Sequence, residues 1–194
     1  MVSNVNADLW EEVVEDAEAM ATEYREEGWD VVCIRPADVS PAEKPDRFGM
    51  SVLLPGSDYD AVEAVIEQPD VDFDGAEVFT HISGPTVYAM AVERDETTQT
   101  AVVIPMVYSM SELDRIFEAA LDSGRLELHL RPLSIETWVT FAHDDPTLFF
   151  DPDTLEKIIE NDPQRQAADQ LGAALDDGTS DAAASTLEDL GEGG

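Results

Sequence analysis

The sequence predicts an α+β fold: a mixed, mostly antiparallel sheet covered by helices and followed by a disordered acidic tail. Apolar residues make up 43 % of the 194-residue chain, a fraction typical of globular proteins. Segments with helical and strand periodicity alternate as far as residue 162. Beyond it alanine, glycine and aspartate dominate, and such a segment cannot bury enough apolar surface to offset its ordering entropy. We therefore predict a single domain over 7–162 and a tail over 163–194.

The clearest element is a helix near the start of the chain. Asn6 or Asp8 can cap it, and Gly28 stands where helices commonly end in a left-handed residue. Most of the remaining positions are acidic, which predicts a solvated outer face. Its apolar residues recur at three- and four-residue spacing and form one stripe: Trp10, Val13, Val14, Ala17, Met20 or Ala21, and Tyr24.

Apolar or alternating segments predict the strands. The segment 98–108 is apolar on both faces, which favours a central position, and Pro105 within it predicts a bulge or an unpaired edge. The segment 36–47 is rich in proline and charge and is predicted to be a loop. The predicted strands are 29–35, 48–55, 76–83, 86–94, 98–108, 125–133 and 134–143.

Three further helices are expected. One covers 57–68 and is closed by Pro69. Another begins after Ser109, which can form a capping box with Glu112, and ends at Gly124. A last helix is expected from Asp151, with Pro152 in its first turn, to the residue before Pro163.

The order strand, helix, strand, strand occurs twice, over 48–94 and over 99–143. Both helices start with a serine followed by an acidic residue three positions later. This order is consistent with a duplicated β-α-β-β unit and a groove between two halves. Any mixed domain with well-capped helices would show a similar pattern of serine and acidic residues.

The charge of the chain is extreme. Forty-four acidic residues against ten basic ones give a net charge of −34. Near 1 M salt the screening length falls to about 3 Å, so such a surface suits a salt-rich cytoplasm. The acidic residues are spread along the chain, which favours a solvated surface over a dedicated partner surface. The negative charge opposes nucleic-acid binding. The sequence shows neither a secretory signal nor a long apolar run, which predicts a cytoplasmic protein without a membrane span.

The segment "FAHDDP" could hold a metal ion or move a proton, but a turn explains it better. His143, Asp144 and Asp145 are adjacent, so their side chains diverge along a strand, and Asp-Pro favours turns. His81 and His129 could approach each other if their strands were neighbours, although His129 falls on the polar face of its strand. We assign no catalytic, cofactor-binding or metal-ligating residue, and expect no cofactor.

Other residues with chemical potential also favour structural roles. Cys33 lies in an apolar run and is interpreted as a small buried hydrophobe. Trp138 either covers the sheet beneath a helix or lines a pocket, and we favour the first. A local patch of Arg94, Arg125 and Arg131 is conceivable, but surface ion pairs are favoured.

The opening "WEEVVEDAEAMATEYREEGWDVVCIRPADVSP", the segment "FGMSVLLPG" and the ending "FAHDDPTLFFD" resemble an uncharacterised haloarchaeal family, a domain of unknown function. The resemblance covers 7–152. It implies a lineage and a compartment, and it brings no catalytic residues.

The leading hypothesis is a non-enzymatic interaction or regulatory domain that binds an unknown protein partner. The alternative is a small-molecule-binding or hydrolytic domain, with His81, His129 or His143 and carboxylates as anchors in a groove between two halves. A third class is a nucleic-acid mimic, which predicts carboxylates in paired rows on one face. The sequence leaves the oligomeric state open.

Overall fold

The computed structural model describes residues 5–133 and 137–150, which belong to one compact unit, Met1–Asp151. The predicted boundary at 162, the helix expected from Asp151 and the predicted tail lie outside the described residues. No helix among those residues is long and apolar enough to cross a membrane. The elements are α1 (Ala7–Glu26), β1 (Asp30–Cys33), β2 (Asp38–Lys44), β3 (Arg47–Leu53), α2 (Gly56–Ile66), β4 (Gly75–Ser83), β5 (Thr86–Asp95), β6 (Thr100–Ser109), α3 (Met110–Ser123), β7 (Leu126–Arg131), β8 (Val139–His143) and a 3-10 turn, η1 (Pro146–Phe149).

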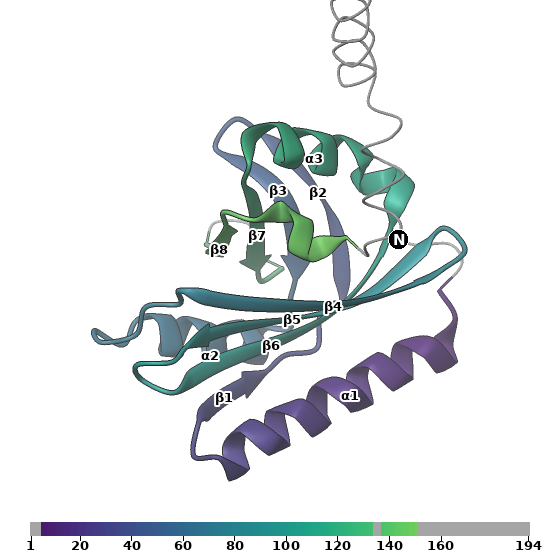
Figure 1. Cartoon of the computed structure of the whole chain (residues 1–194). Coiled ribbons are helices and arrows are strands. Elements are labelled where there is room, and N and C mark those ends of the chain that lie inside the picture. Colours follow the sequence, from purple (N-terminus) through teal and green to yellow (C-terminus); the bar gives the residue numbers. More distant parts are fainter. Residues whose placement is uncertain (1–4, 134–136, 151–194) are drawn as a thin grey trace, which may run out of the picture. The chain divides into compact units, whose positions relative to one another are not determined.

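The predicted α+β class is confirmed, with the strands divided between two sheets instead of one (Figure 1). The first sheet has the order β1-β6-β5-β4 and the second the order β2-β3-β7-β8. Each is mixed and mostly antiparallel. The parallel neighbours are β1 with β6 and β3 with β7, and the other neighbouring pairs are antiparallel.

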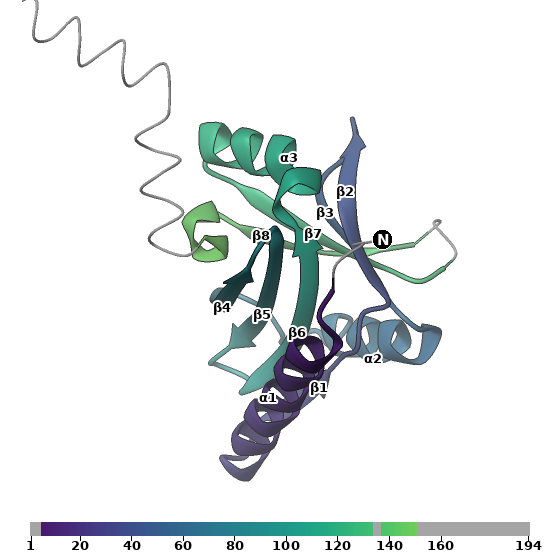
Figure 2. The same cartoon turned by 90° about the vertical axis from the view of Figure 1, so that its right-hand side faces the viewer.

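Helix α1 lies along one face of the first sheet (Figures 1 and 2). Asn6 caps it by accepting a hydrogen bond of 3.0 Å from the backbone N–H of Asp8. Gly28 follows it with a φ of +96°, the left-handed conformation predicted for that position. Ala17 and Ala21 face the sheet, and their small side chains let the helix pack closely against Val92 and Val103.

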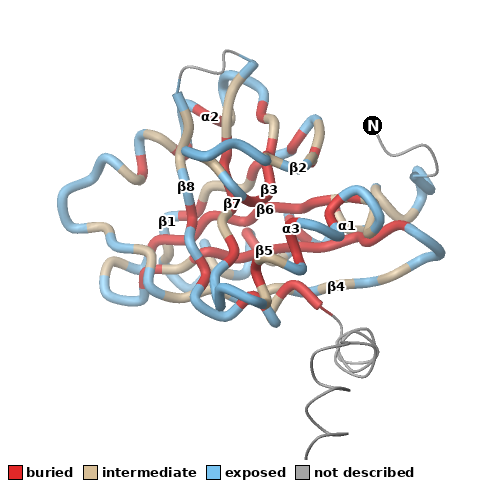
Figure 3. Tube along the Cα trace, turned by 90° about the horizontal axis from the view of Figure 1, so that it is seen from above, coloured by how far each residue is buried: buried red, intermediate tan, exposed pale blue. Residues whose placement is uncertain are grey.

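Strand β6 is central, as predicted: it lies between β1 and β5, and its residues are almost all buried (Figure 3). Pro105 pairs with Met90 in an unbroken register, so it makes no bulge. The backbone of Val103 faces β1, where its carbonyl accepts a hydrogen bond from Ile34, and Pro105 faces the same side because it lies two residues further along. Pairing with β1 ends at Cys33, so the missing amide of Pro105 falls at an unpaired edge.

A second core lies between the two sheets and beneath α3. The alternating leucines of β7, Leu126, Leu128 and Leu130, point into it. The buried face of α3 consists of Leu113, Ile116, Phe117 and Ala120, which recur at the three- and four-residue spacing of an amphipathic helix. The predicted capping box is not formed, because the Ser109 hydroxyl pairs with Ser111 at 3.0 Å and makes no capping bond.

The segment predicted to be a loop contains a strand, β2, so this prediction was wrong. Pro41 and Pro45 argued against a strand. However, β2 is an edge strand that pairs only with β3, and an edge leaves room for residues without an amide donor.

The two β-α-β-β segments are present in the predicted order, but their pairing differs. Strand β3, the first strand of the first segment, joins the sheet that contains β7 and β8 of the second segment. Strand β6, the first strand of the second segment, joins the sheet that contains β4 and β5 of the first segment. In the first sheet β6 pairs antiparallel with β5, whereas in the second sheet β3 pairs parallel with β7. The pairing therefore does not follow a twofold axis.

Candidate functional site

A row of polar side chains crosses the outer face of the second sheet. Ser40, Ser51, His129 and Thr140 are consecutive register partners on β2, β3, β7 and β8. Because alternate residues of a strand share a face, the residues two positions away in each strand lie on the same side. This alternation brings Lys44, Arg47 and Arg131 onto the face that carries the row.

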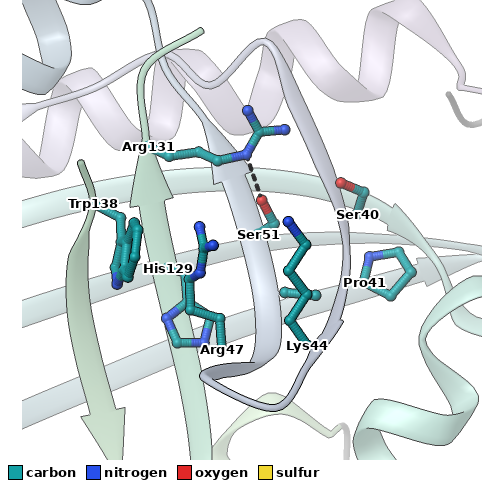
Figure 4. Close-up of a pocket in the computed structure, with 9 residues that line it drawn as sticks. Ser40, Pro41, Lys44, Arg47, Ser51, His129, Arg131 and Trp138 are labelled. Atoms are coloured by element: carbon teal, nitrogen blue, oxygen red, sulfur yellow. Dashed lines mark hydrogen bonds between the residues drawn. The ribbon is translucent and has the colours of Figure 1, made fainter. Parts of the chain in front are cut away.

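These side chains line a pocket of about 160 Å³, here called the basic pocket (Figure 4). Three of the chain's ten lysines and arginines line it, and no acidic residue within 5–133 and 137–150 does. The lining residues are Ser40, Pro41, Ala42, Lys44, Arg47, Ser51, His129, Arg131 and Trp138.

Two of the cations come from the tip of the β2–β3 hairpin. Lys44 and Arg47 are direct cross-strand partners that flank the two-residue turn Pro45–Asp46. Like charges directly opposite each other destabilise a sheet. The repulsion between Lys44 and Arg47 therefore destabilises the hairpin. An acidic residue at either position would replace this repulsion with an attraction.

Trp138 positions Arg47. The guanidinium carbon of Arg47 lies 3.7 Å from the centroid of the Trp138 ring, a cation–π contact. Its Nε lies 3.4 Å from Asp46 Oδ2, and this carboxylate is largely exposed. Trp138 therefore lines a pocket, and the interpretation that we favoured, a cover beneath a helix, was wrong.

Arg131 is held in place by uncharged partners. Its Nε donates to Ser51 Oγ at 2.9 Å, and its Nη1 donates to the carbonyl of Pro132 at 3.4 Å. Within residues 5–133 and 137–150, neither Arg131 nor Lys44 forms an ion pair. The predicted ion pairs are present for the other two arginines: Arg94 meets Glu77 at 3.4 Å, and Arg125 meets Glu127 at 2.9 Å.

His129 lies on the predicted face but is not at the surface, because it is only 3 % exposed. Its Nδ1 lies 2.9 Å from Thr140 Oγ1, and its Nε2 lies 3.6 Å from a carboxylate oxygen of Glu127. Burial lowers the pKa of His129, and the backbone of Phe48 and the charge of Glu127 only partly oppose this. His129 is therefore neutral at pH 7 and contributes a polar wall to the pocket without adding charge.

His143 lies on the opposite face of the second sheet. The predicted turn after it is confirmed, since Asp145 caps η1 through the backbone N–H of Thr147. The sequence did not indicate that His143 is buried, 4 % exposed, with Nε2 2.8 Å from Glu93 Oε1 and Nδ1 3.2 Å from the carbonyl of Leu126. Glu93 is on β5, so this pair joins the two sheets.

The three histidines do not converge. His81 is exposed on β4 of the first sheet, and His129 and His143 lie on opposite faces of the second. No group of three potential ligands among the described residues could hold a metal ion. Cys33 is partly buried, and burial together with the nearby Glu18 carboxylate raises its pKa to about 11, which keeps the thiol protonated and unreactive.

The sequence interpretation missed Ser40, Lys44 and Arg47 because they lie in the segment taken as a loop. Ser51 lies in a predicted strand, where nothing marked it as a site residue. A signal was present. Lys-Pro-Asp-Arg has a two-residue turn with proline at its start, and Ser40, Ala42 and Lys44 alternate before it. Read as a hairpin, this pattern places both cations on one face.

Comparison with known proteins identifies a family without naming an activity. No curated protein and no solved structure matches the chain. The model of a family of unknown function, DUF7529, matches residues 2–151, which include every described element and the whole basic pocket. The chain therefore belongs to this family.

Proposed function

We propose that this chain is a non-enzymatic binding domain whose basic pocket holds a small anionic molecule. One observation carries the proposal: Lys44, Arg47 and Arg131 gather around a pocket that no carboxylate of the described residues lines, in a chain of net charge −34. A bound anion would supply negative charge to pair with these three side chains through charge-assisted hydrogen bonds. The net charge also favours a small ligand, because a long polyanion would be repelled by the rest of the molecule.

The polar groups of the pocket are arranged for binding, not for covalent chemistry. A nucleophilic hydroxyl needs a general base within hydrogen-bond reach. Ser51 Oγ instead accepts a hydrogen bond from Arg131, and His129 is engaged with Thr140. Among the described residues neither serine of the pocket forms a hydrogen bond with a histidine or a carboxylate.

The proposal is tested by isothermal titration calorimetry of the full chain with small phosphorylated and carboxylated compounds, in the lowest potassium chloride concentration that preserves its circular dichroism. We expect at least one class of anion to bind, and Lys44→Gln to weaken binding. The matched control is Arg35→Gln, which removes the same charge at an exposed position outside the pocket. Absence of binding by every anion, or equal losses in the two variants, would refute the proposal.

We further propose that the domain works in the salt-rich cytoplasm of a haloarchaeal cell. The supporting observation is the composition, with forty-four acidic residues and two lysines, Lys44 and Lys157. Screening by concentrated salt removes most of the repulsion among these carboxylates. Thermal unfolding should therefore occur at a much lower temperature in dilute buffer than in multimolar potassium chloride, and equal stability in both would contradict this proposal.

The unknown protein partner expected from the sequence stays a prediction. It is tested by pull-down from a lysate at multimolar salt with the wild-type chain, and the Arg131→Gln variant indicates whether the pocket takes part. Recovery of no specific partner would count against an interaction domain.

A further inference from the structure

We infer that the basic pocket recognises a doubly charged oxyanion, a phosphate group that is either free or the head of a small phosphate monoester. This inference rests on the proposed function and specifies the ligand class. It follows from the charge of the pocket, from the directions of its donors and from its size.

The charge of the pocket matches a dianion. The pocket contains one lysine and two arginines, residue types that are positively charged near neutral pH, and the charge of Arg47 is partly compensated by Asp46 at 3.4 Å. About two positive charges remain uncompensated by the described residues. A monocarboxylate would neutralise one of them, whereas a phosphate monoester carries about −1.5 to −2 at pH 7.

The donors approach from several directions. Figure 4 shows the ammonium group of Lys44 and the guanidinium groups of Arg47 and Arg131 around Ser51. The Nε of Arg131 donates to Ser51, which fixes the plane of the guanidinium, and no hydrogen bond with the described residues uses its Nη2. A tetrahedral phosphate has three terminal oxygens that can accept from separate directions, whereas the two oxygens of a carboxylate lie in one plane and suit a single planar fork.

Trp138 acts as a positioning residue in this arrangement. Its ring holds the Arg47 guanidinium at 3.7 Å, so the side chain is partly ordered before a ligand arrives. A side chain that is already ordered loses less conformational entropy on binding. One face of the indole is occupied by Arg47, so this face supports the cation and cannot stack on the ligand.

The size of the pocket limits the rest of the ligand. A volume of about 160 Å³ is below the roughly 300–1,000 Å³ that encloses a drug-sized ligand. It admits a phosphate group with a short organic substituent. A larger phosphorylated molecule would leave most of its surface outside the pocket.

The test is calorimetric titration of the full chain with acetate, sulfate, inorganic phosphate and glycerol phosphate, at about pH 7.5 and about pH 5.5. We expect sulfate, phosphate and glycerol phosphate to bind at least about tenfold more tightly than acetate at the higher pH, because they form more charge-assisted hydrogen bonds. Glycerol phosphate loses its second charge near pH 6, and its affinity relative to sulfate should fall about fourfold at the lower pH. Sulfate remains a dianion, so the ratio cancels any effect of His129 protonation.

The outcomes separate this inference from the proposed function. If acetate binds as tightly as the dianions, or if the ratio to sulfate is unchanged by pH, the inference is overturned while anion binding stands. If no anion binds, both are overturned. Tighter binding of glycerol phosphate than of inorganic phosphate assigns the site to monoesters, and the reverse assigns it to the free anion. Either order supports the shared chemistry.

Variants at Arg131 and Trp138 test the geometry. Arg131→Gln should weaken phosphate binding about tenfold or more, and Arg131→Lys should recover only part of it, because a lysine cannot replace the fork. Trp138→Phe should retain most of the affinity that Trp138→Leu loses, since only an aromatic ring can hold Arg47. Circular dichroism of each variant and the Arg35→Gln control establish that folding is intact. Wild-type affinity in Arg131→Gln would overturn the inference.

Discussion

The inner side of the second sheet carries His143, which contacts Glu93 of the first sheet, and the basic pocket lies on the outer side of the second sheet. In the inner pair every ring nitrogen of His143 has a partner within 3.2 Å, and the pair is enclosed by the core and by the ring of Phe149. Outside, Lys44 and Arg131 face a pocket without a carboxylate among the described residues. The contrast teaches how to tell structural charge from functional charge: the first is satisfied within the protein, and the second is left for a ligand.

The partners of His143 also fix the orientation of its ring. The Leu126 carbonyl can only accept, so Nδ1 donates to it at 3.2 Å. On the other side of the ring, Nε2 lies 2.8 Å from Glu93 Oε1. The pair therefore holds the two sheets together without an unsatisfied polar atom at the contact, which is the condition under which a buried charge pair is tolerated.

The largest expected effect comes from breaking the inner pair. Glu93→Ala leaves a buried imidazole without its partner and should lower the free energy of unfolding by about 3–5 kcal/mol, measured by urea denaturation in multimolar potassium chloride. The control is Glu77→Ala, which removes the same group from a surface ion pair with Arg94 and should cost less than about 1 kcal/mol. Replacing both inner partners with apolar residues, Glu93→Leu with His143→Phe, should restore much of the loss. Equal losses in the two single alanine variants would contradict a structural role for the pair.

The next largest effect is expected from Gly49→Ala, which should lower both the stability of the protein and its affinity for anions. Gly49 has a φ of +155°, and a Cβ atom there would lie 2.2 Å from the backbone oxygen of Glu127. Gly49→Ala must therefore push β3 away from β7, and we expect a loss of about 2–3 kcal/mol in unfolding free energy together with weaker anion binding.

Gly84→Ala is the matched control for this variant. Gly84 has a φ of +62° and nothing within 4 Å of its would-be Cβ, so only backbone strain of about 1–2 kcal/mol applies. Anion binding should be unchanged in Gly84→Ala. A Gly49→Ala variant with wild-type stability and affinity would contradict the close approach of β3 and β7.

Asp95 provides a second internally satisfied charge and a pH-dependent test. Hydrogen bonds from the backbone N–H of Asp72, from the hydroxyl and N–H of Thr98 and from the N–H of Thr97 lower its pKa to about 2. A lowered pKa in the folded state gives stability that is present above the unfolded value of about 4 and is lost as pH falls towards about 2. Asp95→Asn should therefore be less stable than wild type near neutral pH, and the difference should shrink below about pH 4. A difference that stays constant across this range would contradict the assignment.

The smallest effect has the opposite sign. Lys44→Gln removes the like-charge partner of Arg47 across the hairpin and should leave stability unchanged or raise it by a few tenths of a kcal/mol, while anion affinity falls. The gain should be larger at low salt, because concentrated salt screens the repulsion. Arg115→Gln, which removes a charge paired with Glu43 at 3.0 Å, should give no such gain. A clear loss of stability in Lys44→Gln would place this lysine among the structural charges.

The local features of the fold were predictable where short-range rules decide them. The stripe of α1, the left-handed Gly28 and the alternation of Leu126, Leu128 and Leu130 follow from periodicity and capping alone. The division into two sheets was not predictable, because periodicity identifies strands without saying which strands pair. Strand β2 was missed because Pro41 within it is acceptable only at an edge, and an edge is a property of the whole sheet.

The candidate site was less predictable from the sequence than the fold. The sequence indicated that Arg131 was one of three candidate arginines, but not that Arg94 and Arg125 would find carboxylates while Arg131 would find Ser51. The two serines carry no local signal, since register alone makes them neighbours. His129 was placed on the right face, yet its burial depends on residues from other strands.

By itself the sequence determined the α+β class, the helix boundaries set by caps and glycines, and a charge balance that makes isolated cations conspicuous. These depend on interactions between residues close together in the chain or on composition. Tertiary structure alone decided which charges are satisfied. Glu93 and His143 are 50 positions apart, and Ser51 and Arg131 are 80 apart. Contacts over such separations are set by strand register and sheet pairing, which depend on how the whole chain buries its apolar faces.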